Sequence, residues 1–355
     1  MPKEIAPGPD VEVATDAAPV SRTRRRRAVK LVLVSIAVIV VLLVGLTFAF
    51  SLYLRHLFNS NVRHADLLPS GGPSRIAVAG DAQNILLLGS DSRTLSLAGS
   101  RSDVIQLVHI SKSRTPTVSV IHFPRDLYVA IPGHGKAKIN AAYAWGGAKL
   151  LVQTMENLLD LHIDHVVQIG FTGFAKVTDD LGGVDLYVRQ PVDEPSTGYL
   201  DVGMHHLTGA QALAFVRERH QLAEGDIDRG RDQQAWLKAV AAKVLTSNLL
   251  YHPFQLTSFV QDIAASMTVD QTFSADYVQG LATRLRSAGV SHLRFFTAPY
   301  AGFANCGDTP TPRACDGNGG VGDIDVVNAR QMAALGTALR LDKMASYTNG
   351  LNNNP

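Results

Sequence analysis

Charged residues cluster at the ends of three apolar runs between Asn84 and Asp126. The runs have the length and composition of buried strands, and they are Ile85–Leu88, Val104–Ile110 and Val118–Phe123. The charged residues beside them are Asp91, Arg93, Arg101, Asp103, Arg125 and Asp126. In α/β folds, loops at strand ends carry the chemistry because a rigid scaffold holds them in place. The cluster therefore indicates a site for a metal and a phosphorylated ligand.

Asp91 and Asp103 offer the oxygen ligands that Mg²⁺ prefers. A short loop joins the two strands beside them, so the two carboxylates can meet at one rim of the sheet if those strands are neighbours. Mg²⁺ binds through few carboxylates and takes its other ligands from water and phosphate oxygens. The structural alternative is that Asp91 caps a turn and that Asp103 pairs with Arg101 on the surface.

Seven arginines fall in predicted loops or at the ends of predicted elements. They are Arg93, Arg101, Arg125, Arg217, Arg219, Arg229 and Arg231. A guanidinium group binds phosphate oxygens in pairs, and a diphosphate has enough charge to need several such groups. A single arginine is more often a solvated surface charge, but seven at element ends favour an anion site.

Several other classes of protein are excluded by motif and charge. The sequence has no G-x-S-x-G elbow and no G-x-x-x-x-G-K-[ST] loop, which argues against an α/β-hydrolase and a P-loop NTPase. The net charge is +2, of which residues 1–30 supply +3 and the remainder −1. A body so close to neutrality lacks the basic field of a nucleic-acid-binding protein.

The apolar segment Leu31–Phe50, which continues to Leu54, predicts a membrane-spanning helix. The basic cluster Arg24–Arg27 precedes it, so the positive-inside rule places the N-terminus in the cytoplasm and exports the residues after Arg55. The alternative is a cleaved signal peptide. Such a peptide has a shorter apolar core and a nearby small-residue cleavage site, so a retained anchor is favoured.

Predicted strands and helices alternate along the rest of the chain, which indicates an α/β fold. We expect a single mixed β-sheet flanked by helices on both faces and preceded by one transmembrane helix. The expected parts are a disordered tail (1–28), the membrane helix (29–54), an extracytoplasmic stalk (55–82), a folded domain (83–305) and a C-terminal extension (306–355).

Local signals add two helices and a disulfide to this prediction. Thr208 followed by Gln211 fits a capping box, so a helix is expected from Gly209 to about Phe215. The apolar period predicts another helix over about Asp232–Leu249, preceded by the loop Gly225–Asp228. Outside the membrane, the only two cysteines, Cys306 and Cys315, favour a disulfide over free thiols.

Six motifs in this order resemble the LytR-CpsA-Psr family of membrane-anchored cell-wall enzymes. They are NILLLGSDSR (84–93), GSRSD (99–103), IHFPRDLYVAIPGHGKAKINAAYAWGG (121–147), GFAKVTDDLGGVDL (173–186), LTGAQALAFVRERH (207–220) and GDIDRGRDQQ (225–234). The resemblance implies a phosphotransferase that moves a glycopolymer from a polyprenyl-pyrophosphate carrier to a hydroxyl of peptidoglycan. It also implies that the prenyl chain enters an apolar pocket with the pyrophosphate and Mg²⁺ at its mouth.

The resemblance assigns roles to residues that match the family's motifs. The metal-linked aspartates are Asp91 and Asp103, and either is a candidate for the base that accepts the acceptor's proton. The pyrophosphate-binding arginines are Arg93, Arg101, Arg125, Arg217, Arg219 and Arg229. Asp91, Asp103, Arg125, Arg217 and Arg219 form the expected catalytic set, and the expected rim residues are Lys138, Asn140, Arg231 and Gln233.

One position departs from the family's pattern. Where the family has an arginine before glutamine, this chain has Asp232 before Gln233. Arg231 is a candidate substitute because a long arginine can reach the same anion from an adjacent position. Otherwise a phosphate contact is lost, which keeps open the alternative of a non-catalytic binder of lipid-linked glycopolymer. A further alternative is a pyrophosphatase that releases polyprenyl phosphate without an acceptor.

Overall fold

The structure is a computed structural model that divides into two compact units, residues 1–53 and 54–355. It describes residues 22–73, 80–90, 102–195, 197–218, 222, 224–246, 252–285, 288–307, 313–315, 321–348 and 352–353. Helix α1 (Arg22–Asn61) starts in the first unit and ends in the second. Its segment Ile39–Asn61 is long and apolar enough to cross a membrane, so α1 carries one candidate membrane span, whose last residues already belong to the second unit.

The folded body is built on an eight-stranded mixed sheet. Its strands, in spatial order, are β1 (Arg63–Ala65), β12 (Met267–Asp270), β7 (His165–Gly170), β2 (Gln83–Ser90), β3 (Ser102–Ile110), β4 (Val118–His122), β13 (Leu293–Thr297) and β16 (Asn352–Asn353). Strands β2, β3 and β4 are antiparallel to one another, whereas β2 runs parallel to β7 and β4 parallel to β13. The three apolar runs at the start of the domain therefore form the centre of the sheet.

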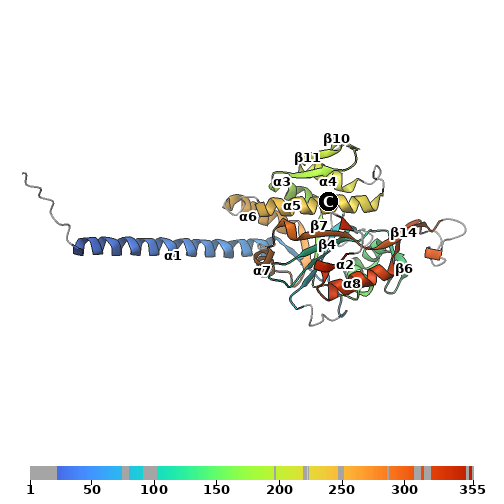
Figure 1. Cartoon of the computed structure of the whole chain (residues 1–355), viewed down its shortest axis with the longest axis horizontal. Coiled ribbons are helices and arrows are strands. Elements are labelled where there is room, and N and C mark those ends of the chain that lie inside the picture. The colour runs from blue at the N-terminus through green and yellow to red at the C-terminus, as the bar shows by residue number, and fades with distance from the viewer. Residues whose placement is uncertain are drawn as a thin grey trace, which may run out of the picture. The chain divides into compact units, whose positions relative to one another are not determined.

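Helices cover both faces of this sheet, because its central strands are apolar on both sides (Figure 1). Leu86 and Leu88 point into a core shared with α2 (Ile139–Leu159) and α8 (Ala329–Arg340). Ile85, which precedes them, and Leu87, which lies between them, pack into the opposite core with α6 (Pro253–Ala265) and α7 (Ala275–Leu285). This arrangement confirms the predicted α/β fold class.

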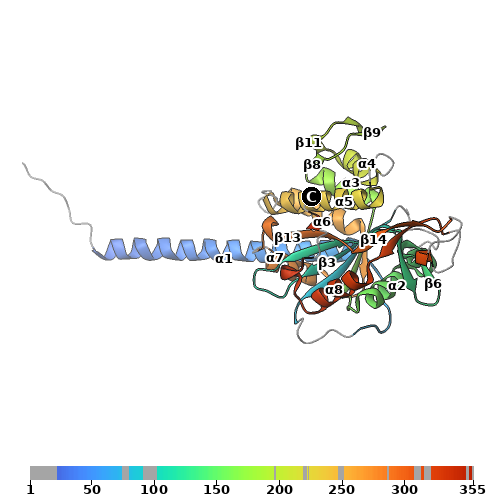
Figure 2. The same ribbon diagram turned by 45° about the vertical axis from the view of Figure 1, so that its right-hand side comes forward.

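A third core lies in a lobe on the same side of the sheet as α6 and α7 (Figure 2). It is formed by α3 (Phe171–Asp180), α4 (Gly209–Arg217), α5 (Asp226–Thr246) and two two-stranded antiparallel sheets. One sheet pairs β8 (Val184–Val188) with β11 (Gly203–Leu207), and the other pairs β9 (Val192–Glu194) with β10 (Gly198–Leu200). Helix α4 starts as the capping box predicts, since the Thr208 backbone N–H donates to Gln211 Oε1 at 3.1 Å.

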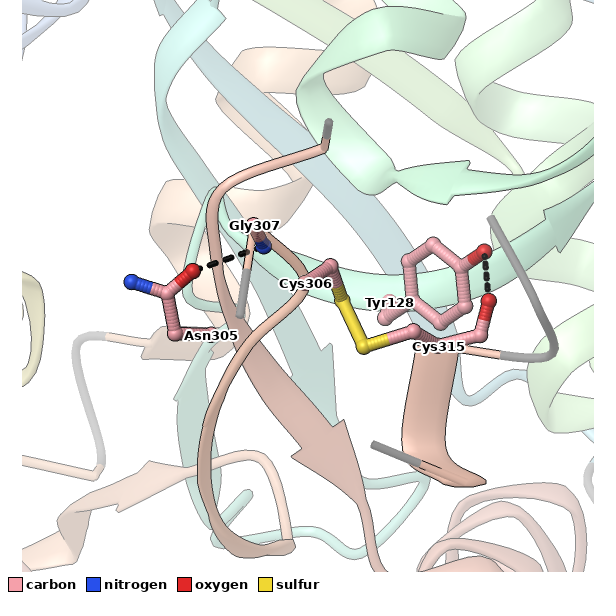
Figure 3. Close-up of a disulfide and its surroundings, with 5 residues drawn as sticks. All are labelled: Tyr128, Asn305, Cys306, Gly307 and Cys315. Carbon is pink, nitrogen blue, oxygen red and sulfur yellow. Dashed lines mark hydrogen bonds between the residues drawn. A yellow bond between two sulfur atoms is a disulfide. The ribbon is translucent and has the colours of Figure 1, made fainter. Parts of the chain in front are cut away.

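A smaller four-stranded sheet lies next to the main one and carries the disulfide. Its spatial order is β14 (Tyr300–Asn305), β15 (Asp323–Val327), β5 (Leu127–Ile131) and β6 (Gly135–Lys138). Three short 3₁₀ turns, Val290–His292, Arg313–Cys315 and Met344–Ser346, complete the described elements. Cys306 and Cys315 form a disulfide beside the ring of Tyr128, whose hydroxyl donates to the Cys315 carbonyl at 3.3 Å (Figure 3).

The structure differs from two predicted domain boundaries. In the described part of residues 55–82, expected to be a stalk, β1 pairs with β12 and Leu67 is buried in the core. Within the expected C-terminal extension, β15 lies between β14 and β5, and α8 packs on α2. Both segments belong to the folded body. The pattern of α8 is helical, since Met332, Leu335 and Leu339 recur at spacings of three and four residues, but a period within one element does not show which other element it packs against.

Candidate functional site

A cavity of about 810 Å³ lies between the main sheet and helices α3, α4 and α5. We call it the apolar cavity, because much of its wall is formed by Leu87, Val104, Ile169, Phe171, Phe174, Leu213, Trp236 and Leu237. Its charged and amide residues are Asp103, Gln106, Arg125, Arg217, Glu218, Arg229 and Gln233. An apolar space with a few convergent charges suits an amphiphilic ligand with an anionic group.

Arg125 is the most heavily paired arginine of this wall. Its Nη1 donates to Asp103 Oδ1 at 2.7 Å, and its Nε lies 3.6 Å from Asp126 Oδ2 and 3.7 Å from Asp226 Oδ1. Burial lowers the pKa of Arg125, but the three carboxylates outweigh burial and raise that pKa above its ordinary value. The guanidinium of Arg125 therefore stays charged, and its three carboxylate partners hold it in position just before β5.

Arg229 and Arg217 reach the same cavity from two different helices. Arg229, only 5% exposed, pairs with Asp226 one turn earlier on α5, and its Nη2 donates to the Asp103 carbonyl at 3.4 Å. Arg217 ends α4, and its guanidinium carbon lies 4.3 Å from the centre of the Phe171 ring. Three arginines from three segments therefore line one cavity.

Asp226 is a site residue that the sequence prediction missed. Its Oδ2 accepts the backbone N–H of Arg125 at 2.9 Å, and its Oδ1 accepts the side chain of Arg229. It therefore ties the start of α5 to the segment between β4 and β5. The three-residue spacing of Asp226 and Arg229, typical of helical ion pairs, was a signal that could have found it.

His122 lies behind this pair and is fully buried on β4. Its Nε2 is 4.0 Å from Asp226 Oδ2. Burial lowers its pKa to about 4, against the opposing effect of Asp226 and with a further lowering by Arg229. The imidazole is thus neutral near pH 7 and adds no charge to the site.

The structure brings together only part of the predicted set. Asp103, Arg125, Arg217, Arg229 and Gln233 line the apolar cavity. Lys138 and Asn140 lie beside it: Lys138 Nζ is 3.1 Å from Asp126 Oδ1, and the Asn140 backbone N–H donates to the Arg125 carbonyl at 3.2 Å. Four predicted residues lie outside the described part of the chain, namely Asp91, Arg93, Arg101 and Arg219.

Arg231 and Asp232 both turn away from the apolar cavity. Arg231 Nη1 donates to Glu224 Oε2 and Asp228 Oδ1, each at 2.6 Å. Asp232 is buried and accepts Arg189 Nη2 at 2.7 Å. Burial raises the pKa of Asp232 to about 6, although Arg189 opposes that shift. The expectation that Arg231 replaces a family arginine at the anion site thus finds no support in its contacts.

Two amide side chains face the apolar cavity with hydrogen-bonding atoms unused. Gln106 Nε2 and Oε1 and Gln233 Oε1 are buried and have no hydrogen-bond partner within the described residues. A buried amide without a partner is costly, so a ligand oxygen or a water would stabilise these groups. Gln106 could not be recognised from sequence as a site residue, because it lies inside an apolar strand.

The donor set fits a Mg²⁺ ion that takes most of its ligands from phosphate and water. Asp103 is 27% exposed and uses Oδ1 for Arg125, so its other oxygen is available to a cation. The described ranges contain no group of three or more His, Cys, Asp or Glu side chains placed to hold a metal. Mg²⁺ needs no such group, since one or two carboxylates suffice when phosphate oxygens complete its shell.

Comparison with known proteins gives consistent results. The model of the LytR_cpsA_psr family matches residues 56–309. The probable cell wall biosynthesis protein LcpB of Corynebacterium glutamicum is 31% identical over 318 residues, which are 85% of this chain and 72% of LcpB.

Two further similarities concern TagT. The polyisoprenyl-teichoic acid--peptidoglycan teichoic acid transferase TagT of Bacillus subtilis is 38% identical over 173 residues, which are 46% of this chain and 53% of TagT. In this sequence alignment the chain therefore spans about half the length of that relative. A solved structure of TagT bound to LI-WTA is 26% identical with a TM-score of 0.59, and the match covers 79% of this chain and 99% of that chain.

Proposed function

Because the chain belongs to the LytR-CpsA-Psr family, we propose that it is a phosphotransferase of cell-wall assembly. It transfers a glycopolymer from a polyprenyl-pyrophosphate carrier to peptidoglycan and releases polyprenyl phosphate. Teichoic acid transferases are among its homologues. The observation that carries the proposal is that Arg125, Arg217 and Arg229 lie on the wall of an apolar cavity.

The donor's two halves match the two kinds of wall. The isoprenoid chain is apolar and would pack against residues such as Phe174, Leu213 and Trp236, and its burial would contribute about 25 cal/mol per Å² of apolar surface. The diphosphate carries several negative charges, which the three arginines would bind through paired N–H groups. A ligand with only one of these halves would leave part of the cavity unmatched.

The arginines and Asp103 supply the chemistry of the transfer. As polyprenyl phosphate leaves, negative charge grows on the bridging oxygen, and fixed guanidinium groups stabilise it without reorganising. Asp103 holds Arg125 in position through the 2.7 Å contact. Mg²⁺, which Asp103 and Asp91 would hold, neutralises further charge on the diphosphate when it is bound.

The candidate membrane helix gives the enzyme its location. We propose a single-pass anchor with the N-terminus in the cytoplasm, because the basic cluster Arg24–Arg27 precedes the apolar segment. The folded body would then lie outside the cell membrane, where both the lipid carrier and peptidoglycan are accessible. No nucleic acid is expected as a partner.

The test is turnover of a polyprenyl-pyrophosphoryl sugar by the full-length chain in detergent, with peptidoglycan fragments as the acceptor. We expect release of polyprenyl phosphate that a chelator abolishes and Mg²⁺ restores. Arg125→Ala and Asp103→Ala should each lower turnover by about 10- to 100-fold, the loss of one charge-assisted contact. The matched control is Arg340→Ala, expected to change turnover less than about threefold because Arg340, on α8, pairs with Asp160 and does not line the apolar cavity.

Each alternative function has its own result in this assay. Donor binding without release would favour the non-catalytic binder. Release that does not depend on the acceptor would favour the pyrophosphatase. Equal losses in the Arg125 and Arg340 variants would show that the apolar cavity is not the reaction site.

A further inference from the structure

A second cavity, of about 520 Å³, lies next to the apolar one. It is bordered by the residue before β5, the start of α5 and the β14–β15 hairpin. We call it the acidic cavity, because its wall carries the carboxylates of Asp126, Glu224, Asp226, Asp323 and Asp325. Described cationic side chains do not line it, so it differs in charge from the arginine-lined apolar cavity.

The acidic cavity has the two features that bind a sugar. Carboxylates accept hydrogen bonds from hydroxyl groups, whereas they repel phosphate. Phe303 also lines the cavity and is 62% exposed, which offers an apolar ring for the C–H face of a pyranose. Asn305, the last residue of β14, also lines the cavity and directly precedes Cys306 of the disulfide (Figure 3).

Asp325 marks where a ligand would bind. It is only 5% exposed, and its Oδ2 is buried without a hydrogen-bond partner in the described structure. Its backbone N–H donates to the Asp126 carbonyl at 3.0 Å, which fixes the residue beside Asp126, another residue of the acidic cavity. A buried carboxylate oxygen without a donor is unfavourable, and a ligand hydroxyl in the cavity would supply that donor.

The two cavities meet at Arg125. Asp126 and Asp226 line the acidic cavity, and both contact the Arg125 side chain that lines the apolar cavity. The acidic cavity therefore adjoins the proposed diphosphate site at Arg125.

We propose that the acidic cavity binds the carbohydrate acceptor and that Asp325 accepts the proton of the acceptor hydroxyl. This inference rests on the proposed function. The hydroxyl oxygen forms a bond to the phosphorus that carries the glycopolymer, and its proton passes to the Asp325 carboxylate. The bond from that phosphorus to the bridging oxygen breaks, and its electron pair leaves with polyprenyl phosphate. Asp103 remains with Arg125 at the donor.

The surroundings of Asp325 suit a proton acceptor near neutral pH. Burial, then the charges of Asp226 and Asp126, raise its pKa to about 7, while Lys138 and Arg125 act in the opposite direction. The charged and titratable groups that face it are Asp126, Asp226, Lys138, Arg125 and Tyr300. Since only the ionised carboxylate accepts a proton, turnover should rise with pH through about 7.

The experiment separates acceptor use from donor binding in the full-length chain. Transfer to muramidase-released peptidoglycan fragments is followed from pH 5.5 to 8.5, and donor-site binding is measured with farnesyl diphosphate. We expect Asp325→Asn to lower kcat more than about tenfold and to remove the rise near pH 7, with farnesyl diphosphate binding unchanged. Phe303→Ala should raise the KM for the fragments and leave the pH profile intact. Asp185→Asn, at an exposed position on β8, is the matched control.

Both variants are expected to fold, so a change in activity would not result from misfolding. Asp325→Asn removes a buried charge without changing the side-chain size, and Phe303 is exposed, so both variants should melt no lower than the parent. An Asp325→Asn enzyme with the parent's rate and pH profile would overturn the inference, as would an equal loss of farnesyl diphosphate binding. Release of polyprenyl phosphate with no transfer to the fragments would overturn the acceptor assignment. No release by the parent would instead overturn the proposed function.

Discussion

Charge at the site is arranged in two zones by the contacts of individual residues. The Nη1 of Arg125 pairs with Asp103, whereas its Nε lies near Asp126 and Asp226. The arginines can thus face an anion while the surplus carboxylates face away from it. An arrangement of this kind lets one site bind a charged donor and a neutral acceptor side by side.

Asp232 shows how a single replacement is compensated. Its carboxylate is buried and paired with Arg189 at 2.7 Å, and it does not line the apolar cavity. Arg189 directly follows β8, so the pair ties the β8–β11 sheet to α5. The departure from the family's pattern therefore concerns packing of the lobe more than donor binding.

Changing Asp232→Arg should destabilise the fold. The new guanidinium would lie against Arg189, and two like charges in a buried place should lower the free energy of unfolding by about 3 to 5 kcal/mol. Adding Arg189→Asp should restore part of this loss, measured by urea unfolding of the single and double variants. Asp185→Arg, at an exposed position, serves as the control. An Asp232→Arg protein as stable as the parent would show that the Arg189 pair contributes nothing.

Helix α5 explains why neighbouring arginines have different roles. The sequence predicted a loop over Gly225–Asp228, but the helix already starts at Asp226, where acidic residues favour the positive end of the helix dipole. Residues two apart on a helix point in directions about 200° apart. Arg229 therefore faces the apolar cavity, and Arg231 faces Glu224 and Asp228.

Elements with a strong local signal were the ones that the sequence could predict. The three apolar runs became β2, β3 and β4, and the Thr208 capping box marked the start of α4. Strand β15 could not be predicted, because a five-residue segment with two aspartates acquires its strand partners only from β14 and β5. The same long-range pairing places Asp325 beside Asp126, so the acidic cavity had no signature in the sequence.

The contact between α5 and β4 can be tested at Gly230. A Cβ atom there would lie 2.2 Å from Cδ2 of the buried His122, so Gly230→Ala should push the helix off the sheet. We expect a loss of about 2 kcal/mol or more in the free energy of unfolding, and weaker donor binding as Arg229 moves. The control is Gly280→Ala on α7, where the new methyl group has open space and should stabilise the helix by about 0.5 to 1 kcal/mol. Equal stability of the two variants would mean that the helix tolerates the displacement.

At the scale of the whole molecule, the ends of the folded body complete its sheet. Strand β1 forms one edge beside β12, and β16 forms the other beside β13. The last residues of α1 also contribute, since Phe58 is buried in the core between the sheet, α6 and α7. The family match over residues 56–309 starts within this segment, which agrees with a folded body that begins well before the predicted start at residue 83.

A soluble fragment should therefore begin at Leu54. A fragment of residues 75–355 would lack the buried side chains of Phe58, Val62 and Leu67 and the pairing of β1 with β12. Each such side chain contributes about 1.5 to 3 kcal/mol when buried. The free energy of unfolding of the shorter fragment should therefore be at least about 4 kcal/mol lower than that of residues 54–355. Urea unfolding of both fragments measures the difference. Phe58→Ala in the longer fragment provides the control and should lose about 3 kcal/mol alone. If the two fragments were equally stable, residues 54–74 would be a linker, as their composition suggests, and the burial of Leu67 would be incidental to the fold.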